Sequence, residues 1–458
     1  MIGLVALMVV CATFTILFVT SDSEASFASW NKGDKFALKG ERNLGLNLET
    51  TNGMLVFADE TSWLRDAKLN DARMSGYTGT VAIFEVTEVT SDEYVVTMTV
   101  ASNISLAAKL SLDGKLVQPG LYITDWDEGY SENPDNILNI SEATTADGTF
   151  GFDTKIAAAS NSTYVIHLEK STMAMKSIDM EMTAYARGYV NMDNYANTTY
   201  DYDWMNDIDT INITSYDSFE SPVTLDLSMS GSLDFEPYLP VIKDNPSTGD
   251  LWEQTCYLNG SFSWTGAFNV AGLPSNITDM IFSENLAKSG ITGFPVDLAK
   301  IYNPGGSGIP VDNGTLEIDS VPVNPEFSCL GQATIDDPVY GTIDINKFGF
   351  RNASLENYLQ LWYYPEKGYL AGIEFHTPPA MYEISMTFDM KSIPVGDAQQ
   401  VADTIIGQVT EEQTYDQVSQ TLSSGEGGIP QMLLIALGVV AVAVVCVAGF
   451  LLLRKKKP

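Results

Sequence analysis

Residues 81–89 read VAIFEVTEV, and residues 94–100 read YVVTMTV. Both runs are rich in β-branched residues and place apolar side chains largely at every second position, which is the pattern of a strand with one buried face. Ser91 and Asp92 between them are typical turn residues. The two runs therefore predict an antiparallel hairpin, and with it a fold built from strands.

The same pattern extends on both sides of the hairpin, over residues 26–170. Further strands are expected at 110–116, at 148–152 and at 163–168, with Asp113-Gly114 as a two-residue turn inside the first of them. Residues 62–74 have helical spacing. We expect residues 26–170 to form one β-rich domain, either an antiparallel β-sandwich or a curved sheet.

A second β-rich domain is expected over residues 171–395. IDMEMTAY at 178–185 and VTLDLSM at 223–229 alternate apolar and polar residues, so each strand buries one face. Strands are also expected at 260–270, 314–318, 327–335, 341–350 and 359–364, and a short helix at 275–286, capped by Ser275 or Asn276. The fold class is mainly β, with two antiparallel β-sandwich or curved-sheet domains.

Pro365-Glu366-Lys367-Gly368 joins the strand at 359–364 to a strand at 369–375. This aromatic hairpin is similar, over a short stretch, to the hairpins of envelope lipoprotein carriers. The resemblance implies one curved antiparallel sheet around an apolar cavity.

The C-terminal part predicts a membrane anchor. Residues 396–429 combine helical spacing with the break SSGEGG, which is typical of a stalk helix and a flexible linker. Residues 430–453 predict a transmembrane helix. Its uncharged residues 432–453 would form a helix roughly 33 Å long, which is close to the thickness of the hydrocarbon core of a bilayer. The basic tail at 454–458 is then cytoplasmic, and the rest of the chain lies outside the cell.

The N-terminal residues 1–25 are apolar as far as Val19 and end in small residues at Ser23 and Ala25. They predict a signal peptide. Because a basic first segment is missing, an uncleaved N-terminal anchor stays open as the alternative. Both possibilities place the two β-rich domains outside the cell.

The charge balance excludes nucleic acid as a partner. The chain has 59 Asp and Glu against 24 Lys and Arg, with a net charge of −35. Such a surface repels phosphate backbones. Because 45% of the residues are hydrophobic, we expect a folded acidic protein rather than a disordered tail.

Glycosylation sequons lie only between the two terminal apolar runs. They begin at Asn103, Asn139, Asn161, Asn197, Asn212, Asn259, Asn276, Asn313 and Asn352. This architecture resembles the single-pass surface glycoproteins of archaea. A eukaryotic type I glycoprotein would look alike, and Lys455 and Lys456 would then match a dilysine retrieval signal.

Cys256 and Cys329 are the two cysteines outside the terminal apolar segments. On the oxidising side of a membrane they predict a disulfide, which would stabilise the fold by about 4 kcal/mol in the chain-entropy model. Two buried thiols are the alternative.

No residue pattern predicts catalysis. Histidine occurs only at His167 and His376, neither with a metal-ligand partner at helical or loop spacing, and no catalytic or phosphate-binding motif is present. Calcium is the candidate cation, because oxygen donors cluster in loop-like sequence. The candidate ligands are Asp125, Asp127, Glu128, Asp201, Asp203, Asp207 and Asp209. Solvated acidic loops are the alternative for both clusters.

Together these features predict a membrane-anchored cell-surface glycoprotein with a structural or adhesive role, whose partners are other surface proteins or glycans. An envelope binding protein or carrier for an apolar ligand is the first alternative, and it predicts a sizeable apolar pocket. An extracellular carboxylate-dependent hydrolase is the second. No cofactor is expected apart from calcium.

Overall fold

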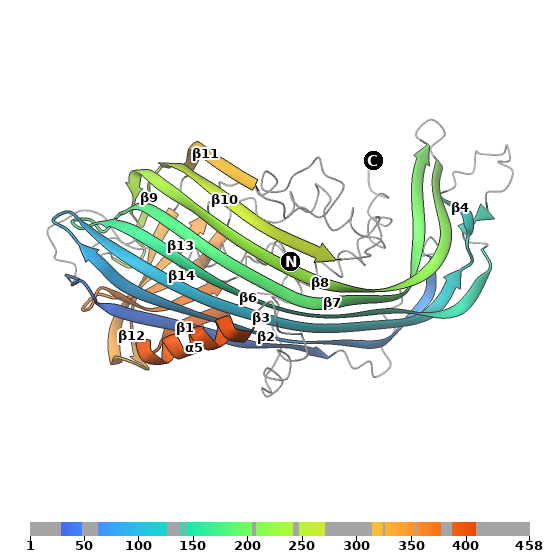
Figure 1. Ribbon diagram of the computed structural model, residues 1–458, viewed down its shortest axis with the longest axis horizontal. Coiled ribbons are helices and arrows are strands. Elements are labelled where there is room, and N and C mark those ends of the chain that lie inside the picture. Colours follow the sequence, from blue (N-terminus) through green and yellow to red (C-terminus); the bar gives the residue numbers. More distant parts are fainter. Residues whose placement is uncertain are drawn as a thin grey trace.

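The computed structural model describes residues 29–47, 63–125, 138–140, 143–203, 208–240, 247–270, 314–323, 326–352, 355–376 and 387–408. These residues are mainly β, as expected, and form one 16-stranded sheet (Figure 1). The strands are β1 Lys35–Asn47, β2 Leu64–Val89, β3 Glu93–Val117, β4 Gly120–Asp125, β5 Leu138–Asn139, β6 Thr145–Glu169, β7 Met175–Asp203, β8 Ile208–Leu239, β9 Leu251–Glu253, β10 Cys256–Val270, β11 Gly314–Val323, β12 Glu326–Asp337, β13 Gly341–Asn352, β14 Leu355–Tyr364, β15 Tyr369–His376 and β16 Thr387–Ser392. The helix α5 spans Val395–Gln408.

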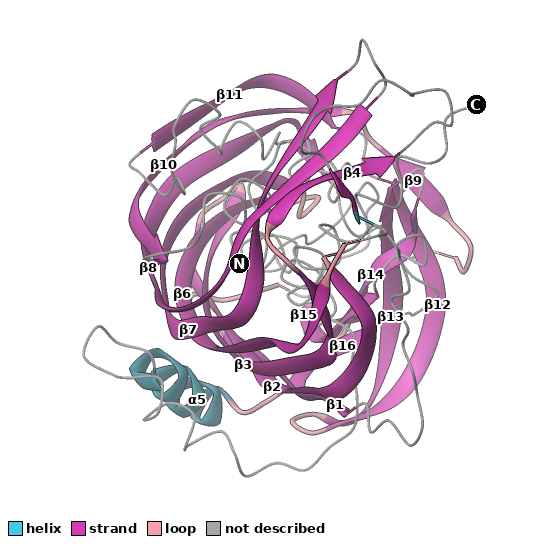
Figure 2. Cartoon of the chain, turned by 90° about the vertical axis from the view of Figure 1, so that its right-hand side faces the viewer, coloured by secondary structure: helices cyan, strands magenta, loops and turns pink. Residues whose placement is uncertain are grey.

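The strands follow the order β11-β10-β8-β7-β6-β3-β2-β1-β16-β15-β14-β13-β12-β9, and β4 and β5 lie off this path, beside β8. Pairing is antiparallel except between β4 and β5. Five strands are very long, with 26, 25, 25, 29 and 32 residues in β2, β3, β6, β7 and β8. A 25-residue strand extends over roughly 80 Å. Seen end-on, the sheet curls around its long axis and has a concave and a convex face (Figure 2).

The hairpin predicted from residues 81–100 is confirmed as the β2–β3 pair. Its turn is closed by a hydrogen bond from the Thr90 amide to the Glu93 carbonyl at 2.9 Å, and the Glu93 amide donates to Thr90 Oγ1 at 3.0 Å. The turn at 365–368 likewise joins β14 to β15. Local sequence therefore determines these two reversals of the chain.

The helical expectation for residues 62–74 is wrong, because residues from Leu64 onward belong to β2. Leu64, Ala67 and Leu69 are buried on one face of the strand. A regular strand would place such residues at every second position, but Ala67 comes three residues after Leu64. Register shifts against β3 between Arg65 and Lys68 and after Leu69 explain the spacing. Each bulge adds a residue to one strand, so the apolar positions imitate the three-residue spacing of a helix.

The expected turn at Asp113-Gly114 is also wrong. Both residues lie inside β3, where Gly114 pairs with Gly148 of β6. A Cβ at Gly114 would lie 2.7 Å from the Arg65 carbonyl oxygen, so the glycine permits a close approach of β2. A strand interior can require glycine for this reason, and the dipeptide then imitates a turn signal.

The sheet continues across the boundary expected between residues 170 and 171. β6 and β7 lie on either side of it and are antiparallel neighbours from Gly151↔Asp193 to Leu168↔Met175. The helix expected at 275–286 lies outside the described residues. So do residues 1–25 and 430–458, and no helix among the residues that the structure describes is long and apolar enough to cross a membrane.

The first part of the expected stalk helix is α5, and it is docked on the convex face rather than standing apart from the sheet (Figure 2). Ala398, Ala402 and Ile405 are buried in a cluster with small residues of four strands. These strand residues are Ala37, Val81, Ala101, Ala157 and Ala159. Their short side chains let the helix lie close to the sheet, which buries its apolar stripe.

The expected disulfide is not formed, and Cys256 and Cys329 are both buried thiols. The strand register gives them different backbone neighbours. The Cys329 amide donates to the Asp250 carbonyl at 2.9 Å, whereas Cys256 comes six residues after Asp250 and pairs with Val323 of β11. Both thiols are buried in the same core cluster.

One end of β7 and β8 turns away from the rest of the sheet (Figure 1). Their register shifts between Met192 and Tyr195, and Asn194 there has a φ of 54°. The Asn194 side chain donates to the Thr149 carbonyl at 2.8 Å. Beyond this irregularity β8 pairs with β4, and an apolar cluster around Tyr122 and Ile211 fills the corner.

Candidate functional site

The concave face of the long strands is apolar. Since α5 covers Ala101 of β3 on the convex face, alternation assigns the even-numbered residues of β3 to the concave face. These residues are Tyr94, Val96, Met98, Val100, Ser102, Ile104, Leu106, Ala108, Leu110, Leu112, Gly114 and Leu116. Apart from Ser102 and Tyr94, none has a polar side chain.

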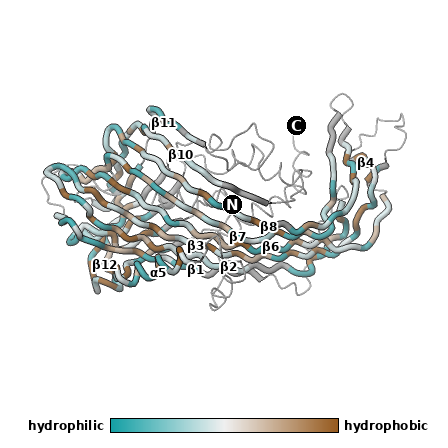
Figure 3. The backbone as a smooth tube through the Cα atoms, viewed as in Figure 1, coloured by the Kyte–Doolittle hydropathy of each residue, from teal (hydrophilic) through white to brown (hydrophobic). Residues whose placement is uncertain are grey.

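The neighbouring strands continue this face in register. Ile104 of β3 lies beside Ala158 of β6, which lies beside Ala186 of β7. On the convex face the same strands carry polar rows, for example Thr99 beside Thr163. Figure 3 shows the resulting alternation of hydrophobic and hydrophilic positions along each strand. The sheet is therefore amphipathic over its length, with its apolar side turned inward.

The concave face has two ends that are covered by other strands. At one end the large core cluster joins Phe84, Met98 and Tyr164 to Phe348 and Ile373 of the strands β13 and β15. At the opposite end, two apolar clusters around Leu106, Phe152 and Tyr122 pack the ends of β2, β3, β6, β7 and β8 together with β4. Both ends are packed cores.

The middle of the concave face differs from both ends. Its cluster consists of Ala158, Met182, Ala184 and Ala186, with Ile104, Leu227, Met229 and Trp264 packed against them. All these described members belong to one layer, the strands β3, β6, β7, β8 and β10. We call this set the mid-face cluster. Within the described part of the chain, no residue of a facing layer belongs to it.

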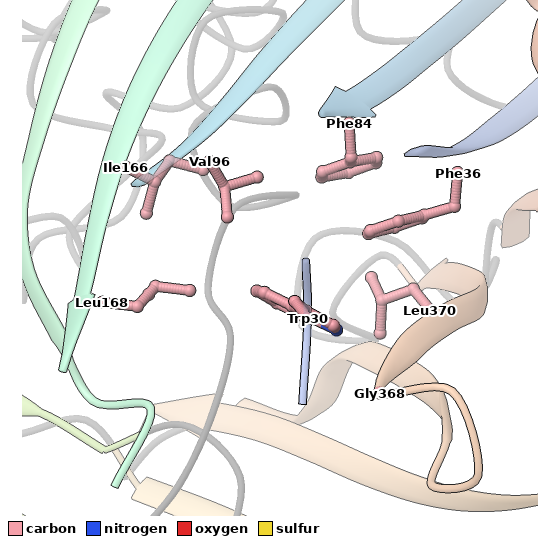
Figure 4. A pocket seen from close by; sticks show the side chains of 8 residues that line it. All are labelled: Trp30, Phe36, Phe84, Val96, Ile166, Leu168, Gly368 and Leu370. Carbon is pink, nitrogen blue, oxygen red and sulfur yellow. The ribbon is translucent and has the colours of Figure 1, made fainter. Parts of the chain in front are cut away.

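A small cavity lies within the first covered end (Figure 4). It is lined by Trp30, Phe36, Phe84, Val96, Ile166, Leu168, Gly368 and Leu370. Its volume is about 10 Å³, which is the space of one water-sized sphere. Phe36 and Phe84 stack at 4.3 Å, and Trp30 Nε1 donates to the Lys367 carbonyl at 3.3 Å. This cavity is too small to hold a molecule larger than water.

The two acidic clusters expected to bind calcium meet at one end of the sheet. Asp125 of β4 pairs with Asp209 of β8, and Asp209 pairs with Tyr202 of β7, next to Asp201 and Asp203. Asp127, Glu128 and Asp207 lie outside the described residues. Among the residues that are described, no group of three or more His, Cys, Asp or Glu could hold a metal ion. Calcium binding stays a prediction.

The described sequons lie in strands rather than beside turns. Asn103 is only 4% exposed, in the middle of β3. Asn197 is exposed, and Asn139, Asn161, Asn212 and Asn259 are half-buried. Asn352 is in β13, whereas Asn276 and Asn313 lie outside the described ranges. Glycosylation stays a prediction, and Asn103 is the least accessible of the sequons whose side chains are described.

His167 lies on the convex face in a network of charged groups. Its Nδ1 is 3.5 Å from Glu93 Oε1, and its Nε2 is 4.0 Å from Asp179 Oδ2. Glu93 also accepts from Lys176 Nζ at 3.2 Å. His376 is at the end of β15, on another strand. These contacts place the imidazole between two carboxylates, and the partners described for His167 include no nucleophile.

Family models, curated proteins and solved structures were compared with the chain, and none matches it.

Proposed function

We propose that the chain is a membrane-anchored envelope protein whose concave sheet face holds an elongated apolar ligand, such as the hydrocarbon chain of a lipid. The observation that carries this proposal is the mid-face cluster, a row of apolar side chains between two covered ends. Its described members all belong to one layer of sheet, and Ile104, Leu227, Met229 and Trp264 among them are only partly buried. An apolar surface of this kind is stabilised by contact with other apolar groups.

The hydrophobic effect supports such binding. A hydrocarbon chain that leaves water gains about 0.8 kcal/mol for each methylene group that it buries, before the entropy of association is subtracted. The adhesive role that we expected first would depend on residues of the outer surface. It would not require an apolar face along five long strands.

The sequence pattern supports the proposed location. The apolar run at 430–453 would keep the sheet at a membrane surface, where hydrocarbon ligands are available. The acidic, polar convex face would keep the protein soluble outside the bilayer.

Photo-crosslinking tests the proposal. The full chain is reconstituted in vesicles that contain a lipid with a diazirine in its acyl chain, and labelled peptides are mapped by mass spectrometry. We expect labels on β3, β7 and β8, at concave positions. Leu227→Gln, at a half-buried concave position, should reduce this labelling several-fold, whereas Ser228→Gln on the exposed side of the same strand should not. Labels confined to residues 430–453 would contradict the proposal.

An adhesive role is the second candidate, because a few large apolar side chains are exposed on the strands β8, β9 and β10. Leu251, Tyr257 and Tyr238 are 57%, 46% and 42% exposed on β9, β10 and β8. Replacing Leu251 and Tyr257 by Ser should then weaken self-association or partner binding measured by sedimentation, and unchanged association would remove this candidate. The hydrolase alternative gains no observation from the described residues and is not proposed.

A further inference from the structure

One sequon lies beside an exposed aromatic ring. Tyr257 and Asn259 of β10 pair with Glu236 and Asp234 of β8, and this pairing has no register shift. Because Trp264 of β10 belongs to the mid-face cluster, alternation places Tyr257 and Asn259 together on the convex face. Tyr257 is 46% exposed, and its ring has no aromatic or cationic neighbour among the described residues.

The amide oxygen of Asn259 has a partner, whereas its amide nitrogen is free. The register between β10 and β11 shifts between Leu258 and Gly260, and Ser320 of β11 has a φ of 50° there. The Ser320 amide donates to Asn259 Oδ1 at 2.9 Å. Asn259 Nδ2 has no hydrogen-bond partner within the described ranges. The amide plane is therefore held through its oxygen, and the nitrogen, which is the atom that carries an N-linked sugar, is directed away from Ser320.

The other described sequons lack such a ring. A tyrosine also lies two residues before Asn197, but the Tyr195 ring packs edge-on against Phe219 at 5.4 Å within an apolar cluster. The residues two positions before Asn103, Asn161 and Asn212 are Ala101, Ala159 and Thr210. Of the sequons for which both side chains are described, Asn259 alone has an exposed ring beside it.

A sugar ring fits this place chemically. One face of a pyranose presents C–H groups, and these pack favourably on the negative face of an aromatic ring. The exposed carboxylates of Asp234 and Glu236 lie beside Asn259 and Tyr257 and can accept hydrogen bonds from sugar hydroxyl groups. The same two charges repel an anionic sugar. The site therefore favours an uncharged hexose or N-acetylhexosamine.

We propose that Asn259 is glycosylated and that the first, uncharged sugar of this glycan packs on the ring of Tyr257. The donor is a sugar joined through phosphate to a membrane lipid. Asn259 Nδ2 forms a bond to the anomeric carbon and loses a proton, the bond from that carbon to the phosphate oxygen breaks, and the lipid phosphate leaves with the electron pair. The inference goes beyond the proposed function because it concerns the convex face, and the two share only the export of the sheet.

Chemical modification of Tyr257 tests the contact. The full chain is purified from the membranes of a host that glycosylates exported sequons, and mass spectrometry of glycopeptides measures the occupancy of each site. Ser261→Ala removes this sequon and retains Asn259 with its bond to Ser320. We expect tetranitromethane to nitrate Tyr257 about threefold to tenfold more slowly in the glycosylated chain than in Ser261→Ala, the protection that a contact as strong as an aromatic pair provides.

Tyr238 is the matched control for nitration. It is 42% exposed and lies on the same face, two residues beyond the Glu236 that pairs with Tyr257. It is therefore about 13 Å further along the strands than Asn259, beyond the reach of the first sugar. Its rate of nitration should be equal in the two chains.

Stability gives a second measurement that a merely exposed tyrosine would not affect. Tyr257→Ser should raise the equilibrium constant of unfolding about threefold to tenfold more in the glycosylated chain than in Ser261→Ala. The Asn197 sequon is the control, and Thr199→Ala removes it. Tyr195→Ser should destabilise the protein equally with and without Thr199→Ala, because Phe219 rather than a sugar contacts that ring.

The remaining outcomes separate the inference from the proposed function. Equal nitration of Tyr257 in both chains, with Asn259 occupied, would overturn the contact. An unmodified Asn259 in a chain that carries a glycan on Asn197 would overturn the inference as well. Absence of glycan from every sequon would overturn both the inference and the export that the proposed function assumes. Loss of lipid crosslinking from a chain with an occupied Asn259 would overturn the proposed function alone.

Discussion

Gly188 of β7 approaches the backbone of β6 so closely that a Cβ atom on it would lie 2.1 Å from the Lys155 carbonyl oxygen. Gly188 pairs with Ile156, the residue after Lys155, in the antiparallel register of β6 and β7. The contact is with backbone rather than with a flexible side chain, so a larger residue must move one strand. The close approach of β6 and β7 therefore requires glycine at this position.

Gly188→Ala should destabilise the protein by about 1–3 kcal/mol, the usual cost of overpacking. The midpoint of urea unfolding, followed by circular dichroism, measures the change. Gly396→Ala in α5 is the control, because nothing lies within 4 Å of a Cβ there. We expect the control to be neutral or more stable by about 0.5–1 kcal/mol. Equal destabilisation by both variants would refute the close approach.

Tyr216 joins two distant parts of the sheet. Its hydroxyl donates to the Val117 carbonyl at 2.7 Å and lies 3.2 Å from the Trp63 carbonyl oxygen, across 99 and 153 residues of sequence. Tyr216→Phe should lower the free energy of unfolding by about 0.5–1.5 kcal/mol. Thermal melting measures this change, and Tyr257→Phe, at an exposed position, should leave the melting temperature unchanged. A silent Tyr216→Phe variant would mean that water replaces the hydroxyl.

The docking of α5 on the convex face can be broken selectively. Ala402 is 2% exposed in the cluster between helix and sheet. Ala402→Glu would bury a charge there, so we expect the helix to detach while the sheet stays folded. Hydrogen exchange of residues 395–408 should then become fast, with little change in β3 and β6. Gln400→Glu, at an exposed helical position, should retain slow exchange.

The strands and the reversals between them were accessible from sequence because they depend on local patterns. Alternation predicted the interior of β2, β3, β7 and β8, and proline with glycine predicted the β14–β15 turn. The length of the strands could not be predicted from sequence. The bulges near Arg65 gave β2 the residue spacing of a helix, and Gly114 gave β3 the dipeptide of a turn. Both residues lie inside strands because of pairing with segments far along the chain.

The candidate site was accessible only in part. Alternation indicated that each strand has an apolar face, but no local signal shows that the faces of β3, β6 and β7 become one concave surface. Ser102 and Ser160 are 58 residues apart and resemble ordinary strand serines until the register places them side by side. The same long-range pairing, invisible in the sequence, gives Cys256 and Cys329 different backbone partners.

The two cysteines should behave as thiols. We expect intact mass spectrometry after alkylation in denaturant to find a label on both Cys256 and Cys329 without prior reduction. In the native protein both should react slowly, since they are 0% and 2% exposed. A chain that is lighter by two hydrogen atoms and unlabelled until reduced would show instead that the disulfide forms and that the local strand register changes.

Alkaline pH should destabilise the protein through Cys256. Burial raises the pKa of this thiol from 9.0 to about 11. Because the folded state keeps the proton more tightly than the unfolded state, the contribution to stability is complete below pH 9 and is lost as pH rises to about 11. The free energy of unfolding in urea should therefore fall over this interval. Cys256→Ala should make that fall less steep. Burial also raises the pKa values of Tyr77 and Tyr340 to about 12. The loss of stability that these tyrosines cause above pH 10 should persist in the variant. An identical pH profile for Cys256→Ala would show that the thiol does not titrate in this range.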